Sequence, residues 1–180
     1  MSALRFLLSG LMLLTASVAA GELVNTHGNV KMQGEIVEAA CYVDPSDRDL
    51  LVEFGDMSAR EISDIPEGLT SHNFSIHLRG CSLASTNKPG SVYHSASITF
   101  TGNTDRHNKN LFVAYSPSDT FGIELFDYKG RNITPGVPSP DYELSAGSNV
   151  LRFRAALVSH DRHVAAGEFS AVAHFVIDYQ

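Results

Sequence analysis

The sequence predicts an all-β sandwich. Short segments in which apolar and polar side chains alternate recur along the chain, and this period of two is typical of strands with one buried face. Between them lie turn-forming stretches rich in Gly, Pro, Asn and Asp, and helical periodicity does not extend beyond one turn near Pro117–Asp119. Many short strands joined by such turns favour two packed sheets in a single domain.

The first twenty residues are organised as a secretory signal peptide. Arg5 supplies the positive charge, Phe6–Leu14 the apolar stretch, and Val18–Ala20 the small residues of a cleavage site. The apolar stretch is shorter than the roughly 20 residues that a membrane-spanning helix needs, and no later segment approaches that length. We therefore expect residues 1–20 to be removed and the mature chain to be exported without direct membrane insertion.

The charge of the chain excludes one class of partner. Residues 1–20 contain one basic and no acidic residue, so the net charge changes from −7 to −8 when they are removed. A strongly acidic protein is poorly suited to bind nucleic acid or an anionic membrane surface. Neither is expected as a partner.

The two cysteines, Cys41 and Cys81, stand 40 residues apart in a chain that is expected to be exported. A redox pair or half of a metal site would be the functional alternatives, but the spacing does not fit a Cys-x-x-Cys motif. Export to an oxidising compartment favours a structural disulfide.

The first alternating segment follows a short polar stretch, Gly21–His27. Gly28, Val30, Met32, Gly34 and Ile36 alternate with polar residues, which predicts a strand with two glycines on its apolar face. Glycine weakens a strand and often marks the close approach of another backbone. Residues 37–43 continue this segment in extended form.

Six further strands are expected in order along the chain. They are Leu50–Phe54, Phe74–Leu78, Ala96–Thr101, Phe121–Asp127, Val150–Val158 and Glu168–Tyr179. The aspartates beside the turns, Asp105, Asp127 and Asp141, are interpreted as local caps and turn formers.

The last strand is unusual because it is strongly apolar and ends at the C-terminus. One face is formed by every second residue: Phe169, Ala171, Ala173, Phe175, Ile177 and Tyr179. Chain ends fray unless they are held in place. This strand therefore requires a partner, in the same chain or in another.

The sequence gives only weak indications of a metal-binding or catalytic site. His160 and His163 share a turn with Asp161 and could chelate a metal, but the convergent ligands of a metal-binding sandwich are not evident, so we expect solvated histidines and no metal or other cofactor. No Gly-x-Ser-x-Gly elbow or other catalytic motif is found. The chain is not expected to be an enzyme.

Five blocks of sequence, in order, carry a resemblance to a known family. They are Gly28–Cys41, Phe74–Cys81, Ile98–Gly102, Gly122–Gly130 and the terminal block from Gly167 to Gln180 with Tyr179 penultimate. Together they resemble the pilin subunits of chaperone–usher fimbriae of the type 1-like kind, over nearly the whole chain from Gly28. Met32 departs from the aromatic residue more usual at its position.

The resemblance implies an incomplete immunoglobulin-like sandwich that lacks its last strand and is completed by a donor strand from another chain. It implies residues 21–37 as a donor-strand extension, with Val30, Met32, Gly34 and Ile36 as its inserted face, and residues 38–180 as the pilin domain. The groove strand would run from Gly167 along the apolar face to Gln180, whose terminal carboxylate a chaperone would anchor. Backbone hydrogen bonds would then give affinity, and alternate side chains in pockets would give register.

The implied function is a structural subunit of an adhesive fimbria at the cell surface, polymerised by donor-strand exchange. The implied partners are a periplasmic chaperone, an outer-membrane usher and neighbouring pilin subunits. A self-complete periplasmic sandwich that binds a metal or a small ligand is the alternative. The place of the subunit, in the main rod or as a minor or adaptor subunit, stays open.

Overall fold

A computed structural model of the chain describes residues 29–34, 38–64, 71–161 and 163–180. The chain divides into two compact units, Met1–Glu35 and Ile36–Gln180, which are described separately. The expected signal peptide lies outside the described residues, as does Ile36 of the expected donor face. No helix in the described ranges is long and apolar enough to cross a membrane.

The described part of the first unit, residues 29–34, forms neither strand nor helix, and all six residues are exposed. The side chains of Val30 and Met32 are 80% and 88% exposed. The alternation of this segment predicts a strand, yet the segment forms no ladder. An extended backbone becomes a strand only where another strand matches its hydrogen bonds.

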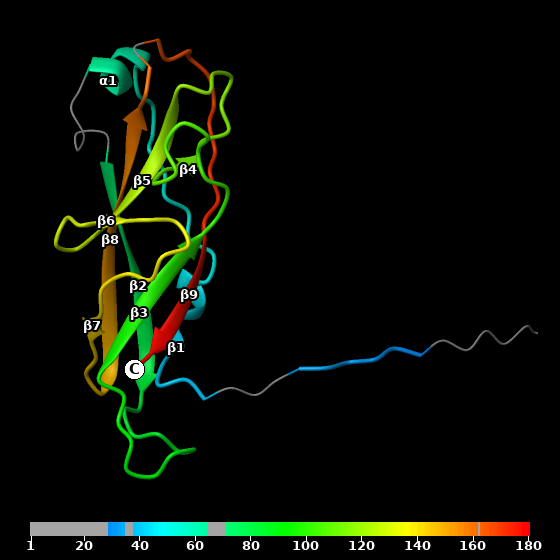
Figure 1. The fold of residues 1–180 in the computed structure, drawn as a ribbon, viewed down its shortest axis with the longest axis vertical. Helices are drawn as coiled ribbons and strands as arrows, with labels where there is room; N and C mark the ends of the chain where they lie inside the picture. Colours follow the sequence, from blue (N-terminus) through cyan, green and yellow to red (C-terminus); the bar gives the residue numbers. More distant parts are fainter. Residues whose placement is uncertain (1–28, 35–37, 65–70, 162) are drawn as a thin grey trace, which may run out of the picture. The chain divides into compact units, whose positions relative to one another are not determined.

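The second unit is a sandwich of two antiparallel sheets (Figure 1). The larger sheet has the order β1-β2-β8-β5-β4, with β6 also paired to β5. Its strands are β1 (Tyr42–Val43), β2 (Ser71–Cys81), β4 (Phe112–Val113), β5 (Phe121–Asp127), β6 (Asn132–Ile133) and β8 (Gly147–Ser159). The smaller sheet has the order β7-β3-β9 and is formed by β7 (Tyr142–Glu143), β3 (Ser95–Thr101) and β9 (His174–Tyr179). The all-β sandwich that the sequence predicts is confirmed.

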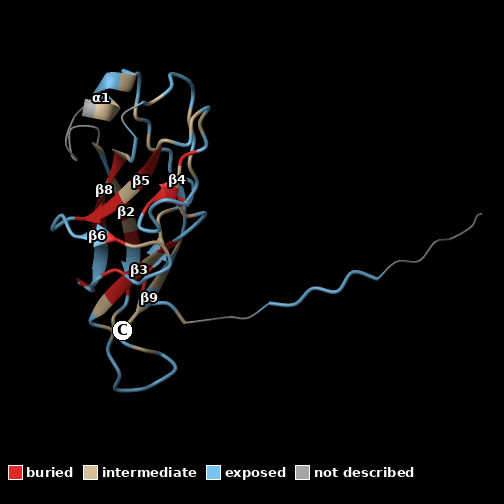
Figure 2. Ribbon diagram, turned by 45° about the horizontal axis from the view of Figure 1, so that its top comes forward, coloured by how far each residue is buried: buried red, intermediate tan, exposed pale blue. Residues whose placement is uncertain are grey.

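The core lies between the two sheets. Buried residues concentrate on β2, β3, β5 and β8 (Figure 2). On β5 every residue except Glu124 is buried, because this strand lies inside the larger sheet between β8 and β4. Phe100 of β3 packs against Phe153 of β8 with ring centroids 5.2 Å apart, which joins one sheet to the other.

Two predicted strands differ from the structure. Leu50–Phe54 forms no strand, and of Glu168–Tyr179 only His174–Tyr179 does, apart from an isolated bridge between Ser170 and Tyr115. Both segments have the expected apolar alternation. Across the open groove that lies between them, neither segment has a neighbouring strand among the described residues.

Two short helices accompany the strands. The 3-10 helix η1 (Pro45–Asp47) follows β1, with the Asp44 carboxylate accepting a hydrogen bond from the Ser46 N–H. The α-helix α1 (Ala59–Asp64) is not predicted from the sequence. Its start is fixed by a capping box, in which Ser58 Oγ accepts from the Glu61 N–H and the Glu61 carboxylate accepts from the Ser58 N–H.

Candidate functional site: an open groove along the C-terminal segment

A groove of about 1360 Å³ opens between the two sheets of the second unit. One wall is the segment 48–57, and the other is the C-terminal segment 164–175. The floor is apolar and comes from β2, β3, β4, β5 and β8 through Phe74, Ile76, Phe100, Phe112, Phe121, Ile123, Leu125 and Ala155. Core residues of both sheets thus face a space that the described part of the chain does not fill.

The C-terminal chain from Phe169 to Tyr179 has one apolar face, and its part up to Phe175 lines this space. Phe169, Ala171, Phe175, Ile177 and Tyr179 are half-buried, whereas the residues between them are exposed. Ala173, the sixth residue of the face, is itself exposed and lines the groove. A strand inside a finished core would have this face fully buried, so the segment covers the core only in part.

One edge of β9 is paired and the other is open. The β3–β9 ladder runs in antiparallel register from Ala96 opposite Tyr179 to Thr101 opposite His174. No second strand pairs with β9 among the described residues. An open edge of this kind offers unpaired N–H and C=O groups to any extended chain that reaches it.

Aromatic contacts cross the groove at the end where the C-terminal segment enters it. The ring of Phe169 lies 5.8 Å from that of Phe54 on the opposite wall and 5.4 Å from that of Phe121 on the floor. Farther along, Phe175 lies 6.2 Å from Phe100. These rings are large apolar surfaces around which a missing strand could pack.

Gly167 marks the start of this segment and packs against Pro117. A Cβ atom at position 167 would lie 2.5 Å from Pro117 Cγ and 3.0 Å from its Cδ. Just beyond, Tyr115 and Ser170 exchange two backbone hydrogen bonds of 2.8 and 3.1 Å. Glycine at 167 therefore lets the chain approach the loop before β5 closely enough to form this bridge.

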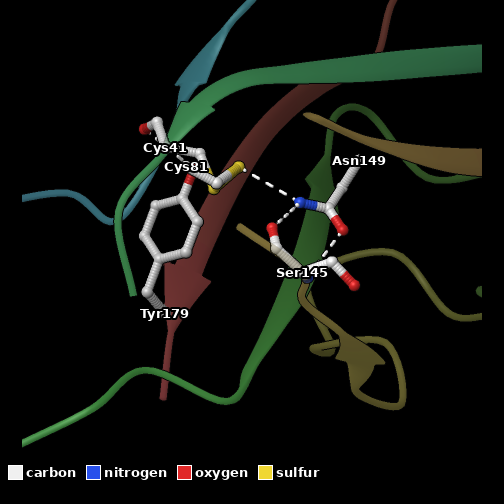
Figure 3. Close-up of a disulfide and its surroundings, with 5 residues drawn as sticks. All are labelled: Cys41, Cys81, Ser145, Asn149 and Tyr179. Carbon is white, nitrogen blue, oxygen red and sulfur yellow. Dashed lines mark hydrogen bonds between the residues drawn. A yellow bond between two sulfur atoms is a disulfide. The ribbon is translucent and has the colours of Figure 1, made fainter. Parts of the chain in front are cut away.

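The far end of the segment is anchored near the disulfide (Figure 3). The Tyr179 hydroxyl donates to the Cys41 carbonyl at 3.1 Å, and burial raises the pKa of this hydroxyl. The carbonyl oxygen of Gln180 accepts hydrogen bonds from the His94 and Ser95 N–H groups, at 2.6 and 3.1 Å. The end of the chain is thereby held against β3.

Cys41 and Cys81 form the expected disulfide, which ties the segment before β1 to the end of β2. Asn149 of β8 donates to Cys81 Sγ at 3.2 Å and to the Ser145 carbonyl at 2.7 Å (Figure 3). The cross-link therefore lies beside Tyr179, at the C-terminal end of β9. It fixes the start of the chain segment that leads to the wall at residues 48–57.

A buried carboxylate stabilises the turn before that wall. Asp47 Oδ2 accepts from the His77 N–H at 2.6 Å and lies 2.7 Å from His77 Nδ1. Burial alone would raise the pKa of Asp47, but the hydrogen bonds from His77 and Ser46 outweigh it and hold the pKa below its usual value. This carboxylate connects η1 to β2 and so positions the chain that enters the groove wall.

The two histidines singled out in the sequence are not brought together. His163 is exposed, with its Nδ1 3.6 Å from Asp161 Oδ1. His160 instead hydrogen-bonds the Asp119 carbonyl and lies close to His107. Asp105 and Asp127 act as turn formers, as expected, each accepting two backbone N–H bonds from the residues that follow it.

Comparisons with known proteins agree with this geometry. The family model for fimbrial protein matches residues 30–180. The chain is 30% identical to the S-fimbrial protein subunit SfaG of Escherichia coli O6:K15:H31 (strain 536 / UPEC), covering 97% of this chain and 93% of that protein. It is 29% identical to the major MR/P fimbria protein of Proteus mirabilis (strain HI4320), covering 91% of this chain and 92% of that protein.

The fold is similar to that of a solved structure, the P pilus rod subunit PapA. The TM-score is 0.68 at 23% identity, over 79% of this chain and 100% of that one. The class defined by fold and groove is thus a pilin-like sandwich. The chain belongs to the fimbrial protein family, which confirms the resemblance stated from the sequence and the structural role in a fimbria that it implies. Its partners include other fimbrial subunits, and its destination is the cell-surface fimbria.

Proposed function

We propose that the groove is the acceptor site for a donor strand from another chain, and that this chain polymerises into a fimbria by donor-strand exchange. The observation that supports this most strongly is the open apolar groove, bounded by residues 48–57, which form no strand, and by the C-terminal segment, whose β9 has a strand partner on one edge only among the described residues. A strand inserted between residues 48–57 and the C-terminal segment could hydrogen-bond to both walls. Its alternate side chains would cover the floor.

The N-terminal extension supplies a segment with the chemistry of such a strand. Val30 and Met32 are large apolar side chains, both exposed, and Gly34 follows in the same alternation. At about 3.3 Å per residue, residues 28–37 would extend about 33 Å, close to the about 36 Å of residues 169–179. The donor and the acceptor therefore match in length as well as in polarity.

The driving force would be completion of the core. Full burial of an aliphatic side chain such as that of Val30, Met32 or Ile36 stabilises by roughly 1.5–3 kcal/mol. Hydrogen bonds to the open edge of β9 would add to this, each with a net contribution of about 1 kcal/mol. No cofactor or chemical step is required for assembly of this kind.

Before assembly the same groove needs protection, because an open apolar edge promotes aggregation. In the proposed pathway a periplasmic chaperone lends a strand to the groove from Gly167 to Gln180. At the outer-membrane usher the extension of the incoming subunit replaces that strand. The groove would then alternate between two strand donors without ever being left exposed.

The test is complementation with synthetic peptides. The exported chain would be prepared with and without a fimbrial chaperone, and a peptide of residues 28–37 would then be added. The proposal predicts a subunit that is unstable alone, is stabilised by the chaperone, and shows a large rise in melting temperature with the peptide. A monomer that is well behaved alone and indifferent to the peptide would contradict it.

Matched peptide variants test the register. Met32→Asp places a charge on the proposed inward face, whereas Lys31→Asp places the same charge on the adjacent outward position. Because a strand alternates its two faces, we expect the first peptide to lose the stabilising effect and the second to keep it. Equal effects of the two substitutions would refute the proposed orientation.

A further inference from the structure

A cluster of metal-ligating side chains lies at the end of the sandwich where the C-terminal segment enters the groove. Asp105 comes from the β3–β4 connection, Asp119 from the β4–β5 connection and His160 from the residue after β8. One ligand atom of each lies within 4.8 Å of those of the other two. Three connections far apart in sequence thus present carboxylate and imidazole groups to one point.

Asp105 is the buried member and has an unused oxygen. The residue is fully buried, and its Oδ1 accepts from the N–H groups of His107 and Asn108, at 2.7 and 3.0 Å. Its Oδ2 is also buried but has no hydrogen-bond partner among the described residues. An unpaired buried carboxylate oxygen costs free energy, and a bound cation would remove that cost.

Two histidines, His160 and His107, lie beside this carboxylate. His160 Nε2 lies 2.9 Å from the Asp119 carbonyl, which can only accept, so in the neutral ring Nδ1 carries the free lone pair. His107 Nε2 accepts a hydrogen bond from Arg106 Nε at 3.0 Å and lies 4.0 Å from Asp119 Oδ2. The two rings are 4.6 Å apart, and His107 can serve as a fourth ligand when Arg106 turns away and releases its Nε2 lone pair.

Arg106 pairs with one carboxylate of the cluster. Its guanidinium pairs with Asp119 Oδ2 at 2.5 Å, and its side chain is 72% exposed. Asp105 and Asp119 are two carboxylates, and a single arginine can neutralise only one of them. A divalent cation would neutralise both carboxylates and let Arg106 turn outward into solvent.

We propose that Asp105, Asp119, His160 and His107 form a binding site for a transition-metal dication of the Zn²⁺ type. Two imidazoles and two carboxylates suit zinc, whereas calcium and magnesium prefer oxygen ligands alone. In a tetrahedral site with ligands about 2.0–2.2 Å from zinc, neighbouring ligand atoms are about 3.4 Å apart. The atoms of Asp105, Asp119 and His160 therefore need to approach one another by up to about 1.4 Å, which the exposed Asp119 and His160 can provide, and the exposed His107 has to move in as the fourth ligand.

Such a site would cross-link the three connections around the entry of the groove. The same β4–β5 connection holds the C-terminal segment through Ser118 Oγ, which accepts from the Ala165 N–H at 3.2 Å. A bound ion would therefore stabilise the folded chain by mass action and rigidify the end where Phe169 meets Phe54. This inference does not depend on the identity of the donor strand.

The test is a competition titration of the full exported chain with ZnCl₂ against a chromophoric chelator, with MgCl₂ in a parallel arm. His160→Ala and Asp119→Asn remove exposed ligands, and His163→Ala is the matched control, because His163 lies on the same turn but outside the cluster. We expect zinc binding that magnesium does not displace, weakened at least about tenfold by either ligand substitution and unchanged by His163→Ala. Zinc should also raise the melting temperature of the original chain and of the His163→Ala variant.

Several results would overturn the proposal. The first is absence of zinc binding in the original chain; the second is equal weakening by His160→Ala and His163→Ala. Competition by magnesium at equal concentration would also refute it. If His160→Ala impairs folding, Asp119→Asn decides alone, since an amide at this exposed position keeps the loop polar while it removes the charged ligand.

Discussion

Replacing Gly167 by alanine tests whether the close approach of residue 167 to Pro117, at the entry of the groove, requires a glycine. The new Cβ would lie 2.5 Å from Pro117 Cγ, about 1 Å closer than carbon atoms normally approach. The proline ring cannot rotate away, so the chain around the Tyr115–Ser170 bridge has to move. Overpacking of this kind costs about 1–3 kcal/mol.

A second cost arises from the backbone. Gly167 has φ of +156°, a conformation that residues with a Cβ rarely adopt, which adds roughly 1–3 kcal/mol. Pro117→Ala removes Cγ and Cδ, so it relieves the clash but not the backbone strain. A double-mutant cycle therefore separates the two contributions.

Urea unfolding of the original chain, both single variants and the double variant, followed by circular dichroism under identical conditions, measures the four free energies. We expect Gly167→Ala to be less destabilising in the Pro117→Ala background by about 1–3 kcal/mol. A coupling energy near zero would show that the contact with Pro117 does not require the glycine. The reasoning about the groove entry would then be wrong.

Three further changes test the elements around the groove. Reduction of the Cys41–Cys81 disulfide, which closes a separation of 40 residues, should lower the free energy of unfolding by about 4 kcal/mol. Urea unfolding with and without dithiothreitol measures this difference. As the control, a Cys41→Ala/Cys81→Ala variant should not respond to the reductant. The folded-state pKa of Asp47 lies below its unfolded value, so the stability that its carboxylate contributes is present above about pH 4 and is lost as the pH falls further. The difference in unfolding free energy between the original chain and Asp47→Asn should therefore be largest at neutral pH and vanish in acid. A difference that does not depend on pH would contradict this. Ser58→Ala removes the cap of α1 and should cost about 1 kcal/mol, whereas an unchanged urea midpoint would show that the capping box contributes nothing.

The longer strands were predictable from their apolar character and from the turns that bound them. β5 begins and ends at the predicted residues, Phe121 and Asp127, because its apolar sequence is followed by a Lys-Gly turn. β4, β6 and β7 have two residues each, too few to show a period of two. The helix α1 is less than two turns long, so periodicity could not reveal it, although the spacing of Ser58 and Glu61 is a readable capping signal.

Only one of the two walls of the candidate groove was predictable from the sequence. The face from Phe169 to Tyr179 could be read from the sequence, since its spacing is local. The opposite wall at residues 48–57 has the same extended character, but its place across the groove depends on the disulfide and on the contact between Asp47 and His77. The cluster at His160 was equally hidden, because its carboxylates stand on loops 41 and 55 residues away.

In the proposed assembly, a donor strand fills the groove between residues 48–57 and the C-terminal segment. Amide hydrogen exchange of the chain, with and without the peptide of residues 28–37, measures this residue by residue. We predict that exchange slows together in residues 50–57 and 169–179 and stays unchanged with the Met32→Asp peptide. Protection confined to one wall, or absent from both while the peptide is bound, would contradict the account.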